Sequence, residues 1–370
     1  MNVTELEKSF QKNFVENNEL GASVSIWKKG EEVFSLSQGW CEREQERPWT
    51  AETLVPFYST TKGLASATLL LLMHEKGIIP DDLVCSVWPE FPVKEGTIGQ
   101  LLSHQLGLAA LDVAANVWDY DAVIEAIEHQ SPNWQPSSAH GYHPRTFGFL
   151  LDELVRRMTG ESLGQMWRTK IAEPLGLEAW IGLPESEFHR VARLYPGKQN
   201  KEDLETGFYR ELHTPDSLVK RAFSSPRGLH SVREMNEPRA WQSGLPAMGG
   251  IGTARAVAKF YQAACGAIPF FPAEMMPWIQ GVRSSGHDLI LQTQTAFSCG
   301  FQLDPLDRVG RKQRHHYGIS RRAFGHPGAG GSHAFGDPDS GLSFCYLMNQ
   351  MELSPLPGAK SLRMIAAMYL

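Results

Sequence analysis

Residues 57–73 read FYSTTKGLASATLLLLM, and this stretch decides how the rest of the chain is interpreted. The apolar run 64–73 predicts a buried helix, with Ser59 at its start and Lys62 one turn further in. Positions three apart lie on neighbouring parts of one helix face, so the Lys62 ammonium can reach the Ser59 hydroxyl. An adjacent amine can take the proton of a serine and make it a nucleophile. Taken alone, the motif is explained more simply by a helix-capping serine and a lysine that extends to solvent.

The spacing Ser-x-x-Lys does not define the site by itself, because it occurs at four places. The other three pairs are Ser9/Lys12, Ser25/Lys28 and Ser217/Lys220. Ser25 lies in a strand-like alternation, where positions three apart point to opposite faces. The pairs at 9–12 and 217–220 lie in polar segments. Only Ser59 combines an apolar lead-in with a following helix that is too apolar for the surface.

Composition narrows the class of protein. The chain has 370 residues, 42% of them hydrophobic, and a net charge of −6, so we expect about two domains and no basic field for nucleic acid. Five scattered cysteines, never in Cys-x-x-Cys spacing, indicate reduced thiols and no zinc site. No signal peptide is visible at the N-terminus, and the run 64–73 is far shorter than the ~20 residues of a membrane span. We therefore expect a cytoplasmic protein that does not bind membranes.

The order of the predicted elements is that of an α+β protein. Helical patterns occupy 3–18, 119–129, 147–158, 161–171, 252–266 and 358–369, whereas strand signals occupy 21–30, 32–37, 297–303 and 342–349, with a glycine-rich segment at 323–332. The stretch 185–245 reads as loops and short helices. The simplest assembly is one sheet domain made of residues 1–58 and 285–370 and a mostly helical domain made of 59–284. The site is then expected where the two domains meet.

Tyr142 is the candidate for the second proton-transfer group. A serine hydrolase must protonate its leaving group and later activate water, so one activated serine is not sufficient. Tyr142 stands in a polar loop just before the helix 147–158, and a neighbouring ammonium would favour its phenolate. An ordinary half-buried tyrosine explains the same position.

Two backbone N–H groups are candidates for binding an oxyanion. Ser59 supplies one at the start of its helix, where N–H groups lack partners. The Gly328-Ala329 segment supplies another, because glycine lets a substrate approach the backbone. A glycine-rich bulge without a ligand is the alternative.

Five segments, taken in order, resemble a known superfamily. They are Ser59-Thr60-Thr61-Lys62, the segment from Thr97 to Leu108, Gly141-Tyr142-His143 with the helix after it, Met248 to Arg255, and Gly325 to Ser332. Together they resemble the serine β-lactamase/penicillin-binding-protein superfamily, in its class C β-lactamase-like branch with the family VIII carboxylesterases. The resemblance implies a β-lactamase/transpeptidase-like fold with no cofactor, and Ser59 as nucleophile. It also implies Lys62 and Tyr142 as the proton-transfer pair, and an oxyanion hole from Ser59 and Ala329, next to Gly328 and His326.

Two positions depart from the β-lactamase pattern. Pro144 replaces the asparagine of the Tyr-x-Asn motif, and His326 replaces the lysine that opens the third motif. Both changes remove polar groups that recognise β-lactams and D-alanyl peptides. The sequence therefore predicts a serine carboxylesterase that acts on short-chain, small-molecule esters through an acyl-enzyme on Ser59. A β-lactamase or D-alanyl peptidase, an acyltransferase, and an inactive binding scaffold are the alternatives.

Other histidines and motifs support no further chemistry. His104 is interpreted as a structural cap near the floor of the site. His140, His143 and the pair His315-His316 lack metal-ligand spacing, so no metal site is predicted. Gly-x-Ser-x-Gly occurs once, at Gly160-Glu161-Ser162-Leu163-Gly164, but it follows the predicted helix 147–158, whereas an α/β-hydrolase elbow follows a strand; no nucleotide-binding glycine motif is present.

Overall fold

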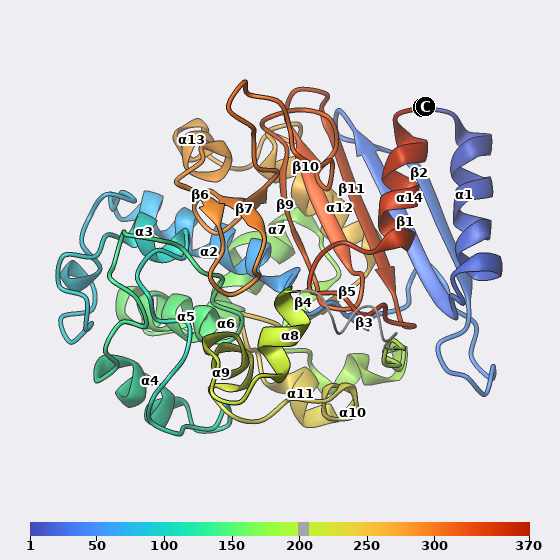
Figure 1. Cartoon of the computed structure of the whole chain (residues 1–370). Helices are drawn as coiled ribbons and strands as arrows, with labels where there is room; N and C mark the ends of the chain where they lie inside the picture. Colours follow the sequence, from blue (N-terminus) through green and yellow to red (C-terminus); the bar gives the residue numbers. More distant parts are fainter. Residues whose placement is uncertain (199–206) are drawn as a thin grey trace.

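A computed structural model describes residues 1–198 and 207–370 (Figure 1). Its main sheet has eight antiparallel strands in the order β2-β1-β11-β10-β9-β8-β7-β6, and a small sheet has the order β3-β5-β4. The strands are β1 (Gly21–Lys28), β2 (Glu31–Gly39), β3 (Val55–Pro56), β4 (Ala179–Ile181), β5 (Gly250–Gly252), β6 (Ser284–His287), β7 (Gln294–Phe297), β8 (Gln302–Leu303), β9 (Phe324–Pro327), β10 (His333–Asp337) and β11 (Leu342–Met348).

The helices lie mostly between β2 and β6 in the sequence. They are α1 (Val3–Glu16), α2 (Thr61–Glu75), α3 (Ile98–Leu102), α4 (Tyr120–Glu128), α5 (Thr146–Thr159), α6 (Leu163–Trp167), α7 (Glu173–Leu175), α8 (Gly207–His213), α9 (Leu218–Ser224), α10 (Val232–Met235), α11 (Pro238–Gln242), α12 (Ala254–Ala264), α13 (Met276–Gln280) and α14 (Ala359–Met368). This mixture of helices and antiparallel sheets confirms the predicted α+β class.

Helices cover both faces of the main sheet because its central strands carry apolar side chains on both faces. Val24 of β1 and Phe344 of β11 belong to a core that also contains residues of α1 and α14, which lie side by side in Figure 1. Cys345 and Leu347 point to the opposite face, where α12 packs against β1, β10 and β11. The sheet is therefore the middle layer of a three-layer arrangement.

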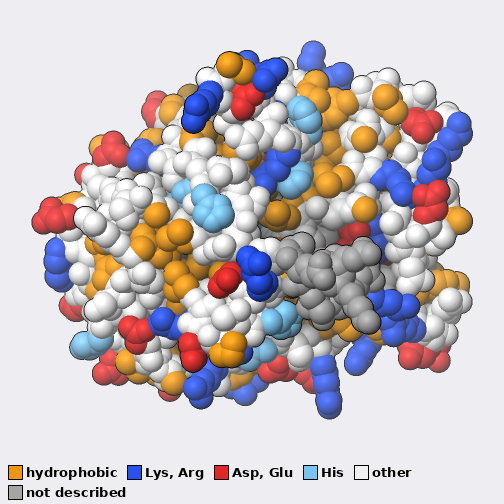
Figure 2. Space-filling model, viewed as in Figure 1, with side chains coloured by type: hydrophobic (Ala, Val, Ile, Leu, Met, Phe, Trp, Pro, Cys, Tyr) orange, Lys and Arg blue, Asp and Glu red, His pale blue; other side chains and the backbone are white. Residues whose placement is uncertain are grey.

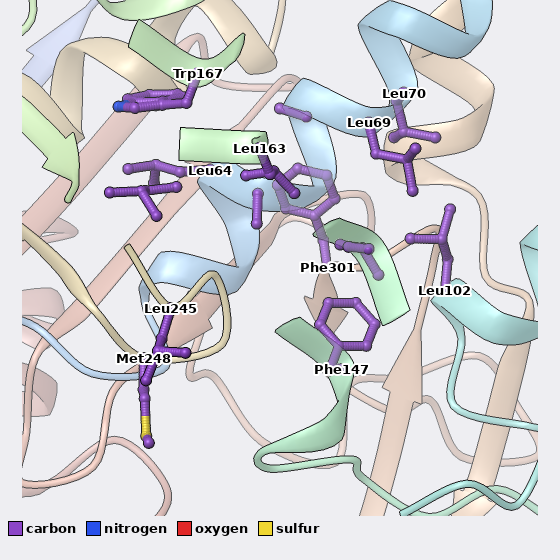
Figure 3. Close-up of a cluster of buried hydrophobic side chains, with 14 of the residues drawn as sticks. Leu64, Leu69, Leu70, Leu102, Phe147, Leu163, Trp167, Leu245, Met248 and Phe301 are labelled. Atoms are coloured by element: carbon purple, nitrogen blue, oxygen red, sulfur yellow. The ribbon is translucent and has the colours of Figure 1, made fainter. Parts of the chain in front are cut away.

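Helix α2 is the centre of the second core. Every residue from Thr61 to Met73 is buried, as expected for a helix that is apolar on all sides. Leu64, Leu69 and Leu70 point into a cluster that contains Phe147 of α5, Leu163 and Trp167 of α6, and Phe301 (Figure 3). Packing on all sides fixes the helix, and its first turn carries the candidate nucleophile.

One predicted strand is wrong. Residues 297–303 form no single strand, because β7 ends at Phe297 and β8 begins at Gln302. Between them, Gly300 adopts a φ of +85°, and a Cβ atom there would lie 1.9 Å from the Ser66 hydroxyl oxygen of α2. The chain reverses direction tightly against α2, which only a glycine permits.

The division into two domains stays a prediction. Strand β6 begins at Ser284, close to the predicted boundary, whereas α12 belongs by sequence to the helical part and packs on the sheet.

Charged side chains of both signs are interspersed over the face in Figure 2. Within residues 1–198 and 207–370, no helix is long and apolar enough to cross a membrane.

Candidate active site

Ser59 lies in a sharp turn that leads into α2. Tyr58, the residue before it, has a φ of +47°, a strained value for a residue that is not glycine. Strand β5 holds this turn: the Gly250 N–H donates to the Thr61 hydroxyl (2.8 Å), and the Phe57 N–H donates to the Gly250 carbonyl (3.0 Å). A Cβ atom at Gly250 would lie 2.2 Å from the Phe57 ring, so this contact requires glycine. The turn leaves Ser59 partly exposed while the helix behind it is buried.

Lys62 is fully buried and contacts three oxygen atoms. Its Nζ lies 3.1 Å from the Ser59 Oγ, and it donates to the Pro144 and Ala247 carbonyls, each at 2.9 Å. Burial, followed by the nearby positive charge of Arg145, lowers the pKa of Lys62 well below its usual value. The Arg145 side chain donates to the carbonyls of Pro226, Gly228 and Leu229. The sequence identified Lys62, but neither the two carbonyl acceptors nor the neighbouring arginine.

Tyr142 lies next to the same pair. The Lys62 Nζ is 4.8 Å from the centre of the Tyr142 ring. Burial raises the pKa of Tyr142, and a hydrogen bond with the Ser59 hydroxyl only partly opposes that shift. We expected a neighbouring ammonium to favour the phenolate; the structure gives the opposite direction, because burial acts on the phenol and also favours a neutral Lys62 amine. The free protein therefore holds Tyr142 as a phenol.

A buried aspartate, which the sequence analysis missed, positions the Tyr142 loop. The Asp288 Oδ1 accepts hydrogen bonds from the backbone N–H groups of Tyr142 (3.0 Å), Ile290 (2.9 Å) and Leu291 (2.9 Å). Its Oδ2 accepts from the Thr295 hydroxyl at 3.1 Å. Asp288 lies 146 positions from Tyr142, and no motif spacing joins the two.

His104 contacts this loop through its backbone and its ring. Its φ is +62°, its Nδ1 accepts from the His143 N–H (3.3 Å), and its carbonyl accepts from the Gly141 N–H (3.1 Å). Its ring lies 5.2 Å from the Tyr142 ring and 4.6 Å from the Phe297 ring, measured between centroids. Burial lowers the pKa of His104 well below its usual value, so a neutral imidazole packs against Tyr142 and Phe297.

The glycine-rich segment ends beside the nucleophile turn. Strand β9 pairs with β8 only at Phe324 and Gly325, so the chain beyond them has no β8 partner. A Cβ atom at Gly328 would lie 2.1 Å from the Phe57 carbonyl oxygen, which places this strand end directly against the residues before Ser59. Within the described chain, neither the Ser59 N–H nor the Ala329 N–H donates a hydrogen bond, and both residues are partly exposed.

His326 is buried on the same strand, and its ring lies 5.8 Å from the Tyr142 ring. Burial lowers the pKa of His326 to about 3, so the imidazole is neutral. Its Nδ1 lies 2.8 Å from the Pro327 carbonyl, which only accepts, so we assign the proton to Nδ1. The Nε2 atom is then a lone-pair acceptor, and it has no partner within the described residues. A cationic contact for a substrate carboxylate is missing at this position.

The structure thus brings Ser59, Lys62, Tyr142 and His326 together, with Gly328 and Ala329 beside them. Among residues 1–198 and 207–370, no three histidine, cysteine, aspartate or glutamate side chains gather in a way that would hold a metal ion.

This geometry is that of a serine hydrolase built on a β-lactamase-like fold. The beta-lactamase family model matches residues 6–367, so the chain belongs to that family. The chain is 27% identical over 351 residues to the "Esterase/beta-lactamase LipL" of Mycobacterium tuberculosis, covering 91% of this chain and 78% of that protein.

Two solved structures are also similar to this chain. A family VIII carboxylesterase superposes with a TM-score of 0.87 at 31% identity, covering 99% of this chain and 96% of that one. A penicillin-binding protein homologue from Caulobacter crescentus superposes with a TM-score of 0.84 at 32% identity, with the same coverage. The fold and the superfamily predicted from the sequence are therefore confirmed.

Proposed function

We propose that this protein is a serine carboxylesterase that hydrolyses short-chain, small-molecule esters through an acyl-enzyme on Ser59. One observation carries the proposal: the buried Lys62 Nζ lies 3.1 Å from the Ser59 Oγ while two carbonyls accept its hydrogen bonds. A neutral amine has two N–H groups and one lone pair. Because Pro144 and Ala247 accept both N–H groups, the lone pair is left for the serine proton.

In the acylation step, Lys62 takes the proton as the Ser59 oxygen attacks the ester carbonyl. The N–H groups of Ser59 and Ala329 receive the oxyanion of the tetrahedral intermediate. The Tyr142 phenol, held protonated by burial, donates its proton to the leaving alcohol and regains one from Lys62. The ester C–O bond breaks, the alcohol departs, and the acyl group stays on Ser59.

Deacylation reverses these roles with water in place of the alcohol. Water gives its proton to the neutral Lys62–Tyr142 pair and attacks the acyl carbon. Ser59 then leaves as a hydroxyl, and the carboxylic acid is released. Lys62 and Tyr142 thus return to their starting protonation states.

The preference for neutral esters rests on what the site lacks. The His326 imidazole is neutral, so it offers no ion pair to the carboxylate of a β-lactam or a peptide. Pro144 has no side-chain amide, and its carbonyl is already used by Lys62. The names of the carboxylesterase and of the esterase/beta-lactamase support the same choice.

A comparison of two substrates tests the proposal. Turnover of p-nitrophenyl butyrate and of a chromogenic cephalosporin is measured on the wild type, on Ser59→Ala and on Ser9→Ala, which changes a serine of the same spacing in α1. We expect ester turnover to exceed cephalosporin turnover, to vanish in Ser59→Ala and to persist in Ser9→Ala. Faster cephalosporin hydrolysis would make the protein a β-lactamase instead.

β-Lactam acylation is the second candidate, since two similar proteins carry β-lactamase or penicillin-binding names. The inactive-scaffold alternative is tested by intact mass after treatment with a fluorophosphonate. A mass shift in the wild type that is absent in Ser59→Ala would exclude it. Acyl transfer is distinguished by adding an alcohol acceptor and detecting the new ester. The cytoplasmic location stays a prediction.

A further inference from the structure

A cavity of about 620 Å³ lies away from Ser59, between α5, α6, β4 and residues 242–246. Its volume is within the ~300–1,000 Å³ range of small-molecule sites. Neither Ser59, Lys62 nor Tyr142 lines it. The catalytic proposal leaves this cavity without a role.

The walls combine aromatic rings with two guanidinium groups. The Arg156 guanidinium carbon lies 4.6 Å from the centre of the Tyr120 ring, and that of Arg168 lies 5.3 Å from the centre of the Trp180 ring. All four side chains line the cavity. Stacking on an aromatic ring orients a guanidinium, and a guanidinium pairs well with a carboxylate because it is planar and weakly hydrated.

The lining has one more cationic than anionic side chain, and each of its two arginines already has one carboxylate partner. Two arginines stand against one aspartate, Asp152, whose Oδ2 accepts from the Arg156 Nε at 2.8 Å. The Arg168 Nε binds Glu173 at 3.1 Å, and its Nη1 donates to the Leu177 carbonyl at 3.2 Å. The Arg168 Nη2 has no hydrogen-bond partner in the described part of the chain, so it is available to a ligand.

The cavity is joined to the catalytic lysine by one short loop. Leu245 and Pro246 line the cavity and also a small void that touches Arg145 and Ala247. The Ala247 carbonyl accepts the hydrogen bond from Lys62. The cavity and the hydrogen-bond acceptor of Lys62 are therefore joined by the segment 245–247.

We propose that this cavity is a second ligand site, separate from Ser59, that binds a small carboxylate with an aromatic or aliphatic body. The carboxylate pairs with Arg168 and Arg156, and the apolar body packs against the Trp180, Tyr120 and Phe149 rings. The inference does not depend on the esterase proposal, because it concerns binding alone.

Isothermal titration with 4-phenylbutyrate, and with its primary amide as the neutral analogue, tests the site. We expect saturable 1:1 binding of the acid to the wild type. The amide should bind at least about tenfold more weakly, since it lacks the charge-assisted pair. The double variant Arg156→Gln/Arg168→Gln is expected to bind the acid more weakly than the wild type by a similar factor. In the control Arg43→Gln, which removes a guanidinium stacked on Tyr195 elsewhere, the affinity is expected to be unchanged.

A second variant is needed because Arg156→Gln leaves Asp152 without its ion pair, and the double variant can therefore misfold. Gln242 lines the cavity from an exposed position at the end of α11, so Gln242→Trp narrows the site and leaves the core intact. It is also expected to weaken binding. Absence of saturable binding, equal affinity for acid and amide, or full binding by both folded variants would each overturn the proposal.

Discussion

Replacing Lys62 with methionine tests how the buried amine affects both catalysis and the stability of the fold. Methionine is similar in length and apolar, so it fits a fully buried position. The substitution removes the proposed base, whose loss is expected to lower kcat by about 10²–10⁴. It also leaves the Pro144 and Ala247 carbonyls without their donor, at a cost of about 1–3 kcal/mol each in the free energy of unfolding.

The pH dependence of stability gives the sharper result. The pKa of Lys62 is lowered in the folded protein, so the unfolded chain, with a lysine pKa near ~10.4, binds one more proton at intermediate pH. The wild type therefore gains stability as pH rises from the folded pKa to the unfolded pKa. Over that interval its free energy of unfolding should increase, relative to Lys62→Met, by about 1.4 kcal/mol per pH unit. Below the folded pKa the difference should be constant.

The measurement is urea denaturation of both proteins at several pH values between 6 and 10, with ester turnover measured in parallel. Lys259→Met is the matched control: it removes a partly exposed lysine of α12 that donates to the Leu175 carbonyl at 2.7 Å. The control should keep full activity. A stability difference between wild type and Lys62→Met that stays flat across the whole range would refute the lowered pKa. A variant that keeps more than a tenth of the wild-type kcat would refute the proposed role as base.

Three further predictions concern the groups around Lys62. Tyr142→Phe removes only the phenol oxygen, so kcat for the butyrate ester should fall by about 10²-fold or more while the melting temperature changes little; normal turnover would show that the phenol transfers no proton. Asp288→Asn puts an NH2 group where one carboxylate oxygen now accepts a hydrogen bond, so we expect the free energy of unfolding to fall by about 1–3 kcal/mol and kcat to fall more than KM changes. If Asp288 had a purely structural role, kcat of the folded variant would be unchanged. Gly328→Ala places a Cβ atom 2.1 Å from the Phe57 carbonyl oxygen, which should displace the Ala329 N–H and lower kcat by about 10²–10³. In the control Gly207→Ala the new Cβ has no neighbour nearer than 3.8 Å, so kcat should not change, and equal kinetics of the two variants would contradict the proposed oxyanion hole.

Local signals in the sequence were sufficient for the helix that carries the nucleophile. The run after Lys62 is apolar on every side, and such a helix is stable only inside a protein, so Ser59 was separated from the other serines of the same spacing. Periodicity likewise located α1, α4, α5, α12 and α14 to within a few residues. It failed at 297–303, since the reversal at Gly300 is imposed by contact with Ser66 of α2, a residue far away in the sequence.

By itself, the sequence determined the α+β class and the candidates Ser59, Lys62 and Tyr142, because these depend on residue type and local order along the chain. The superfamily followed from the resemblance of five segments. Only the tertiary structure decided their protonation. The amine of Lys62 and the phenol of Tyr142 are driven toward their neutral forms by burial under segments distant in the chain, and Asp288 and Ala247 reach them from 146 and 185 positions away. Desolvation and hydrogen bonding act through space, and for that reason the folded chain, and not its local motifs, determines which group carries the proton.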